Sequence, residues 1–227
     1  DTDEFEPYYI TANHCVPEAA SASQVDIIWD FRAATCGSSS APALSTLPRS
    51  NGVSMLATSG TLDCTLMKLD DVPSGDFGRT YVGWSLTDPA VDDECVVLHH
   101  PDGAHMRISY CNVIDLDVPT VSLGFVHQNE VQYPVGVTEG GSSGSCLLSA
   151  SEGYALIGTL SNGPSHTCGA DRSANTDRFA SFRRFYENTD AKSYLSGTDP
   201  GNGGTINCPA VQVFKDNAQV LRDLRAL

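Results

Sequence analysis

The sequence predicts an all-β protein built from short strands and many turns. Its 227 residues include 20 glycines, and 41% of the residues are hydrophobic, which is enough apolar surface for a core. Helical periodicity is scarce, whereas short runs rich in β-branched and aromatic residues alternate with Gly, Pro, Asn and Asp. These observations favour strands connected by turns over packed helices.

Short strands are expected along most of the chain. Residues 8–12 form a predicted strand that leads to His14, and residues 25–31 alternate and are rich in strand-forming side chains. Residues 36–51 are rich in Gly, Ser, Ala and Pro, which is typical of a loop. Further strands are expected at residues 52–56, 65–69, 81–86, 118–127, 130–133 and 179–186.

A hairpin is predicted where a turn sequence separates two apolar runs. The turn is Pro101-Asp102-Gly103-Ala104, and the runs are residues 95–100 and 105–110. This pairing brings Cys95 roughly opposite Cys111, so a disulfide between them is plausible if the geometry suits it.

A second hairpin and a helical pattern follow in the C-terminal half. The hairpin joins Leu147-Leu148 to residues 154–160 across a turn at residues 149–153. Residues 211–227 place apolar side chains at helical spacing, so a short C-terminal helix is expected. These side chains are Val213, Phe214, Val220, Leu221, Leu224 and Leu227.

The acidic composition argues against two classes of partner. The chain has 13 basic and 28 acidic residues, so its formal net charge is −15. Nucleic acids and anionic membrane surfaces require basic patches, so neither is an expected partner. The charge is equally consistent with attraction of cationic substrates and with a surface adapted to saline surroundings.

The cysteine pattern indicates an oxidising compartment. Eight cysteines are dispersed along the chain without a C-x-x-C pair, which argues against a four-thiolate zinc site. Dispersed cysteines in such a chain favour disulfides and therefore a secreted protein. The sequence contains no run of about 18 apolar residues, so it predicts no membrane-spanning helix. We expect a mature, processed segment.

Three segments carry residues suited to acyl transfer. His14 lies in Thr-Ala-Asn-His-Cys, Asp63 lies in Gly-Thr-Leu-Asp-Cys, and Ser143 lies in Gly-Ser-Ser-Gly-Ser. A serine hydroxyl needs a base, an imidazole can take and return its proton, and a carboxylate can hold the imidazole tautomer. Each residue alone is more simply a packed histidine, a turn aspartate or a loop serine. Together they follow the order His, Asp, Ser, one of three orders known for this triad.

These motifs resemble the trypsin-like serine endopeptidases, and in particular the bacterial lysyl endopeptidase branch. The resemblance runs from about Tyr8 to about residue 200. It implies a chymotrypsin-like fold of two antiparallel Greek-key β-barrels. Besides the three segments above, it is carried by His99-His100-Pro101, Arg107-Ile108-Ser109, Gly136-Val137-Thr138-Glu139 and Gly163-Pro164-Ser165.

The resemblance implies a role for each triad residue. Ser143 is the expected nucleophile, His14 the general base, and Asp63 the residue that orients His14. The backbone N–H groups of Gly141 and Ser143 are the expected oxyanion hole. A protein or peptide is the expected substrate, and no cofactor is required.

The serine segment also matches a different catalytic motif. Gly140-Gly141-Ser142-Ser143-Gly144 also spells the G-x-S-x-G nucleophile elbow. We reject this interpretation because a β-hairpin rather than a helix follows, and His166 is the only downstream histidine.

Ser142 stands where relatives activated by a new N-terminus carry an aspartate, so we expect an oxyanion hole that does not need a freed α-amino group.

The resemblance also suggests a pocket for a cationic side chain. Asp177 is the expected pocket carboxylate that selects lysine or arginine, with Asp171 as a competitor because the alignment needs a one-residue insertion. Lysine-selective relatives stack a tryptophan and a histidine beside this pocket, and Thr120 and Ser161 occupy those positions here. Arginine is therefore expected to be accepted as well as lysine. The expected substrate-binding residues are Asp177, Ser161, Gly163 and Thr138.

No metal site is expected. His99, His100 and His105 fall in one hairpin, but their spacing is loose and no carboxylate is well placed beside them. No loop has the calcium-binding pattern of an EF-hand.

The resemblance predicts that the first barrel is incomplete at its N-terminal side. In the family, about 40 residues precede the segment matching Tyr8 and supply strands of this barrel, together with partners for Cys15, Cys36 and Cys168. We therefore expect a second polypeptide to cover the open edge, disulfide-linked through some of these cysteines.

The sequence thus predicts three regions and one leading function. Residues 1–75 are the partial first barrel, residues 76–190 the second barrel, and residues 191–227 a tail with a helix. The leading function is a secreted serine endopeptidase. The alternatives are a catalytically silent, protease-like binding module and, with less support, an esterase.

Overall fold

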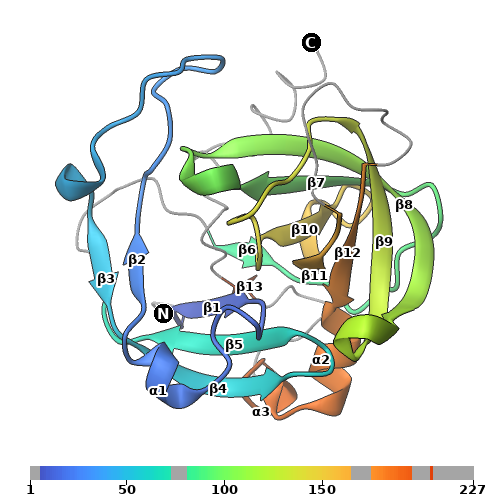
Figure 1. Cartoon of the computed structure of the whole chain (residues 1–227). Helices are drawn as coiled ribbons and strands as arrows, with labels where there is room; N and C mark the ends of the chain where they lie inside the picture. Colours follow the sequence, from blue (N-terminus) through green and yellow to red (C-terminus); the bar gives the residue numbers. More distant parts are fainter. Residues whose placement is uncertain (1–5, 73–80, 165–174, 196–204, 207–227) are drawn as a thin grey trace.

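The computed structural model describes residues 6–72, 81–164, 175–195 and 205–206, which form two β-rich lobes (Figure 1). The all-β class predicted from the sequence is confirmed, with few and short helices. The predicted C-terminal helix at residues 211–227 lies outside the described residues, as does most of the expected boundary between the lobes. No helix among the described residues is long and apolar enough to span a membrane.

The second lobe is a closed antiparallel barrel. Its strands follow one another around the barrel in the order β10-β11-β12-β9-β8-β7 (Figure 1). The interior is lined by alternating apolar side chains such as Val97, Val113, Val131 and Phe179, each fully buried. The strands are β7 (Glu94–His99), β8 (Arg107–Thr120), β9 (Phe125–Val135), β10 (Cys146–Ser149), β11 (Ala155–Asn162) and β12 (Thr176–Ser181).

The predicted hairpin and disulfide are both confirmed in this barrel. Cys95 of β7 lies directly opposite Cys111 of β8, and their sulfur atoms are bonded. The short 3₁₀ turn Pro101–Gly103 connects the strands, with Asp102 in the left-handed region at φ 48°.

Removing this disulfide is expected to destabilise the second lobe. The bond closes a loop with a sequence separation of 16 residues, and loops of this size are worth about 3 kcal/mol of unfolding free energy. We expect the double variant Cys95→Ala/Cys111→Ala to lose about this amount in urea unfolding. Ser122→Ala, at an exposed position of the same lobe, should change stability by less than about 0.5 kcal/mol. Equal stabilities of the double variant and the unaltered chain would contradict the expectation.

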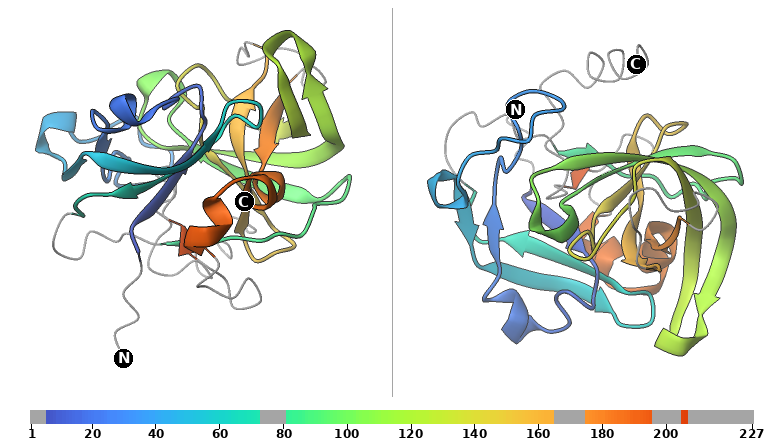
Figure 2. Two further views of the ribbon diagram at one scale, coloured as in Figure 1. Left: turned by 90° about the horizontal axis from the view of Figure 1, so that it is seen from below. Right: turned by 45° about the horizontal axis from the view of Figure 1, so that its top comes forward.

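The first lobe consists of two separate antiparallel sheets. One has the order β1-β5-β4, and the other pairs β2 with β3. Tyr9, Ile27, Trp29 and Met67 pack together between them. Figure 2 shows that these sheets curve toward each other without closing, so the expected incomplete barrel is confirmed for the described residues. The strands are β1 (Tyr8–Thr11), β2 (Asp26–Ile28), β3 (Arg49–Asn51), β4 (Val53–Ser59) and β5 (Cys64–Leu69).

Two short helices and a shared apolar cluster join the lobes. Helices α2 (Phe182–Asn188) and α3 (Ala191–Leu195) follow β12 and lie beside the first-lobe sheet (Figure 1). One cluster of buried residues contains Ile10 and Leu66 from the first lobe together with Leu148 and Phe182. The two lobes therefore share a continuous apolar core, which stabilises their relative position.

The predicted strand at residues 179–186 is wrong in its second half. The strand ends at Ser181, whose hydroxyl accepts a hydrogen bond from the Arg184 N–H and caps helix α2. Phe182 and Phe185 are fully buried at helical spacing. Burial of both rings on one face favours the helix over a continued strand.

Other boundaries also differ from the predictions. The chain reverses at the turn Val121–Leu123, which ends at Gly124 with φ 72°. The predicted strand at residues 118–127 is therefore divided between the end of β8 and the start of β9, and the predicted strand at residues 130–133 is part of β9. The predicted loop 36–51 contains strand β3, and strand 81–86 is reduced to β6 (Val82–Gly83). The remaining elements are α1 (Ala19–Ala22), η1 (Leu44–Thr46) and β13 (Thr205–Ile206), which pairs with β6.

Candidate active site

His14 and Asp63 meet at one end of the first-lobe sheet. His14 follows strand β1, and Asp63 occupies the tight turn between the neighbouring strands β4 and β5 with φ 50°. The His14 Nδ1 lies 2.8 Å from Asp63 Oδ2, and the His14 backbone N–H donates to Asp63 Oδ1 at 2.8 Å. The Asp63 side chain is fully buried, whereas 39% of the His14 side chain is exposed. The buried carboxylate therefore fixes the position of an accessible imidazole.

The carboxylate also sets the charge preference of the imidazole. Hydrogen bonding to Asp63 is the main cause that raises the pKa of His14 above its ordinary value, followed by hydrogen bonding to Cys15, while partial burial opposes the shift. This arrangement stabilises the protonated ring, as a base that carries a proton during a reaction requires.

Ser161 is a third partner of the buried aspartate. Its hydroxyl donates to Asp63 Oδ2, and Ser161 itself is buried at the end of β11. Asp63 therefore accepts hydrogen bonds from both His14 and Ser161, which satisfies a carboxylate without solvent access. The sequence analysis predicted a substrate-binding role for Ser161 and did not predict this contact. A serine at the end of an apolar strand does not indicate which distant residue its hydroxyl will bond.

The Ser143 loop is held against the strand that precedes His14. Gly144 has φ 78°, and a Cβ atom there would overlap the Thr11 hydroxyl and approach the Ala12 nitrogen to 2.9 Å. The Gly144 N–H donates to the Leu160 carbonyl at 2.8 Å, which ties the loop to β11. Only glycine permits this close packing, which brings Ser143 to the boundary between the lobes.

The backbone N–H groups of Gly141 and Ser143 stay available for a ligand. The N–H groups of Glu139, Ser142 and Gly144 all donate to protein oxygen atoms. Within the part of the chain that the structure describes, those of Gly141 and Ser143 have no acceptor. Gly141 reaches its conformation at φ 88°. The two unpaired groups are the pair expected to form the oxyanion hole.

Asp177 packs against Gly163, the residue that follows the neighbouring strand β11. Its carboxylate is 2% exposed and accepts a hydrogen bond from the Thr138 hydroxyl. The Tyr133 phenol lies close to this carboxylate, so burial and the negative charge of Asp177 raise the pKa of Tyr133 well above its ordinary value. A Cβ atom on Gly163 would overlap the carboxylate. The absence of a side chain at Gly163 therefore makes room for the Asp177 carboxylate. The competing candidate, Asp171, lies outside the described residues.

The two positions matched to aromatic residues of relatives belong to a polar network. Asn162 donates to Ser161 Oγ and to Gln128 Oε1, both at 3.2 Å. Thr120 donates to the same Gln128 oxygen at 2.6 Å, and Arg178 Nη1 donates to Thr120 Oγ1 at 2.9 Å. Hydrogen bonds therefore connect Thr120 to Ser161 without any aromatic ring.

The three histidines near the β7–β8 turn bond to protein oxygen atoms. His99 contacts two serine hydroxyls, His100 Nδ1 lies 3.0 Å from the Ala104 carbonyl, and His105 Nε2 lies 3.2 Å from the Ser38 carbonyl. No group of three metal-ligating side chains occurs among the described residues.

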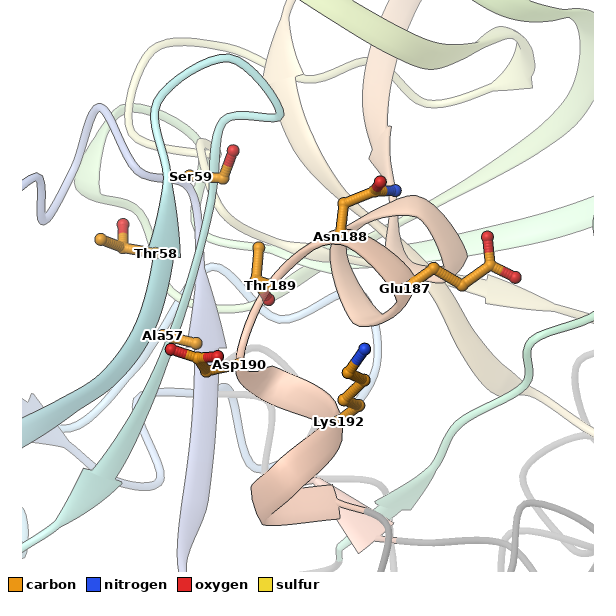
Figure 3. Close-up of a pocket in the computed structure, with 8 residues that line it drawn as sticks. All are labelled: Ala57, Thr58, Ser59, Glu187, Asn188, Thr189, Asp190 and Lys192. Carbon is orange, nitrogen blue, oxygen red and sulfur yellow. The ribbon is translucent and has the colours of Figure 1, made fainter.

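A cavity of about 420 Å³ lies between β4 and the helices α2 and α3 (Figure 3). None of the candidate site residues lines it. Thr58 in its wall accepts a hydrogen bond from Asn13, the residue before His14, at 2.8 Å. The cavity is lined by Ala57, Thr58, Ser59, Glu187, Asn188, Thr189, Asp190 and Lys192.

Comparison with known proteins confirms the family resemblance. The family described as lysyl endopeptidase, C-terminal domain, matches residues 1–180. The chain is 35% identical over 179 residues to a lysyl endopeptidase of Pseudomonas aeruginosa, covering 78% of this chain and 38% of that relative. It is 28% identical over 150 residues to the secreted RxLR effector protein 73 of Plasmopara viticola, covering 65% of this chain and 37% of that relative. The chain therefore spans less than half the length of either relative.

Solved structures support the fold independently. A serine-to-alanine variant of the HtrA-type protease AlgW with a decapeptide superposes with a TM-score of 0.55 at 15% identity, covering 86% of this chain and 49% of that chain. The same protease bound to a tripeptide gives a TM-score of 0.52 at 16% identity, covering 80% of this chain and 50% of that chain. The chain belongs to the lysyl endopeptidase family, matches its C-terminal domain, and has the fold of the trypsin-like proteases.

Proposed function

We propose that the protein is a serine endopeptidase with the triad His14, Asp63 and Ser143. Ser143 Oγ attacks the scissile carbonyl carbon while His14 takes the hydroxyl proton. The N–H groups of Gly141 and Ser143 donate to the resulting oxyanion. His14 then returns the proton to the leaving amine, which leaves an ester between Ser143 and the acyl part of the substrate. Water cleaves this ester by the same steps, with His14 again as the base.

One observation carries the proposal. An accessible imidazole is bonded through Nδ1 to a fully buried carboxylate, beside a loop that has two unpaired N–H groups flanking Ser142. Packing alone does not require a buried charge at this position, and its desolvation costs several kcal/mol unless it is well bonded. Orientation of His14 as a base accounts for that cost.

We further propose that Asp177 selects substrates with lysine or arginine before the scissile bond. A buried carboxylate that is bonded to Thr138 Oγ1 and packed against Gly163 carries the charge that would pair with a cationic side chain. The name of the Pseudomonas relative, lysyl endopeptidase, is consistent with this preference. Ser161 acts mainly through Asp63 in this proposal.

The test is cleavage of an unstructured protein, with products identified by mass spectrometry, beside a Ser143→Ala control. Cuts after Lys or Arg that vanish in the control support the nucleophile and the pocket together. Cuts after other residues retain the triad but contradict the role of Asp177. If no cuts occur and a fluorophosphonate fails to label Ser143, the protein is the alternative, a silent binding module. Hydrolysis of esters but not of peptides would instead identify an esterase.

The activity should increase as pH rises through the pKa of His14. A general base must be neutral, and the hydrogen bond to Asp63 holds a proton on His14 to higher pH than an ordinary histidine does. The acidic limb of kcat/KM is therefore expected to have its midpoint above 6.5. His127→Gln, at a half-exposed histidine on β9, should leave the profile unchanged. A midpoint well below 6.5 would contradict this expectation.

We also propose that strands from a second polypeptide complete the first lobe. Among the described residues, β1 pairs only with β5, and β2 pairs only with β3, so each strand has one free edge. Cys15 and Cys36 carry exposed free thiols in the same lobe. The natural protein should change mass between non-reducing and reducing gels, and Cys15→Ser or Cys36→Ser should abolish the change. No change in mass would contradict a disulfide link.

An oxidising, extracellular location is consistent with the Cys95–Cys111 disulfide.

A further inference from the structure

A buried histidine lies directly beneath the loop that carries Ser143. His99, at the end of β7, is 1% exposed. Its Nδ1 lies 2.8 Å from the Ser142 hydroxyl, and its Nε2 lies 3.0 Å from the Ser109 hydroxyl. Ser142 and Ser109 are themselves 0% and 1% exposed. The triad does not use His99, so this fully enclosed imidazole needs another explanation.

The hydrogen bonds determine which ring nitrogen of His99 carries the proton. The Ser109 hydroxyl donates to the Val137 carbonyl at 3.2 Å, so it accepts from His99 Nε2–H. The Nδ1 atom is then an acceptor, and the Ser142 hydroxyl donates to it. The Ser142 oxygen in turn accepts from the Glu139 N–H at 3.3 Å. The ring nitrogens of His99 and the hydroxyls of Ser142 and Ser109 are therefore all hydrogen-bonded. Burial lowers the pKa of His99 to about 4, which keeps the ring neutral.

The same loop is also braced from the side. The Asp102 N–H donates to the Gly140 carbonyl at 2.7 Å. The His100 carbonyl would lie 3.3 Å from a Cβ atom on Gly141. The β7–β8 turn thus contacts the residues just before Ser142, while His99 holds Ser142 from below.

We propose that His99 is a positioning residue that holds the Gly141 and Ser143 N–H groups in place through Ser142. Ser142 lies between these two residues, so a fixed Ser142 side chain restricts both peptide groups. This role rests on the proposed peptidase function and explains how the loop is ordered without an ion pair at Ser142. Because donors for an oxyanion must be aligned before the reaction, loss of this link should affect the chemical step.

Two substitutions at His99 separate positioning from packing. The amide oxygen of His99→Asn takes approximately the place of Nδ1, so it can still accept from Ser142. The amide of His99→Gln reaches the place of Nε2, so it can still contact Ser109 but leaves Ser142 without its acceptor. Glutamine is closer to histidine in length, so a purely packing role predicts that Gln is tolerated better than Asn.

The expected result is a loss in kcat of about 100-fold for His99→Gln, with KM little changed, and a much smaller loss for His99→Asn. Thermal melting of each variant controls for folding. Ser142→Ala breaks the same link by removing a single oxygen atom, so it replaces His99→Gln if that variant does not fold. Equal losses for Asn and Gln, or a loss confined to KM, would overturn the proposal.

Amide chemical shifts provide a readout that does not depend on activity. The Gly141 and Ser143 N–H resonances should move in His99→Gln and stay close to their original positions in His99→Asn. If the unaltered protein does not hydrolyse peptides and a fluorophosphonate leaves Ser143 unlabelled, the peptidase proposal fails. In that case these shifts alone decide whether His99 positions the loop. Unchanged shifts in His99→Gln would overturn the positioning role whatever the activity.

Discussion

Replacing Asp63 by asparagine is expected to lower kcat for peptide hydrolysis by about 10⁴-fold, the effect known for this substitution in a Ser-His-Asp triad. The Asp63 carboxylate accepts from the His14 backbone N–H, from His14 Nδ1 and from the Ser161 hydroxyl. An amide has one oxygen and one NH₂ group, so it must direct a donor at one of these donors. A donor facing Nδ1 would place the His14 proton on Nε2, where Ser143 needs an acceptor.

Steady-state kinetics of the purified variant provide the measurement. Asp92→Asn is the matched control, because Asp92 also has a positive φ, of 73°, but lies exposed in the second lobe. That control should retain full activity. Ser161→Ala removes a single donor from the same carboxylate and should cost only about 1 kcal/mol of transition-state stabilisation. Full activity in Asp63→Asn would contradict the proposed triad.

Replacing Asp177 by asparagine is expected to abolish most cleavage after Lys and Arg. The substitution preserves shape but removes the negative charge that would pair with the substrate. Loss of one partner in a buried charge pair costs roughly 2–5 kcal/mol, which corresponds to about 30- to 4,000-fold in kcat/KM. The loss should be confined to substrates with a cationic side chain before the scissile bond, because Asp177 is bonded to Thr138 and takes no part in the proposed proton transfer.

The competing assignment supplies the control. Asp171→Asn removes the other candidate carboxylate and should leave the preference unchanged. If instead Asp171→Asn removes cleavage after Lys and Arg while Asp177→Asn does not, the pocket carboxylate is Asp171. Gly163→Ala is a second check, because its Cβ atom would overlap the Asp177 carboxylate. It should raise KM for the same substrates while esters lacking a cationic side chain are still hydrolysed.

Local patterns in the sequence were sufficient for several strands and for both hairpins. Short strand-forming runs placed β1, β5 and β7, and Pro-Asp-Gly-Ala located the turn that sets Cys95 opposite Cys111. Such signals act between near neighbours in the chain, so they survive without any tertiary information. The family, too, was recognisable, because its motifs are local in sequence.

Helix α2 shows where this local reasoning failed. Phe182 and Phe185 fit a helix as well as a strand when read alone, and burial against the first lobe decided between them. The turn at Val121–Leu123 was missed for a related reason. Its residues favour strands locally, and the left-handed conformation of Gly124 determines the reversal.

The sequence by itself determined the all-β class, the family and the identity of the candidate triad residues. Only the tertiary structure decided their hydrogen-bond partners: Ser161 on Asp63, and His99 on Ser142. Asp63 and Ser161 are 98 residues apart, and His99 and Ser142 are 43 residues apart. Their contacts depend on how the two lobes pack and how the second barrel closes, and no local pattern encodes distances of that kind.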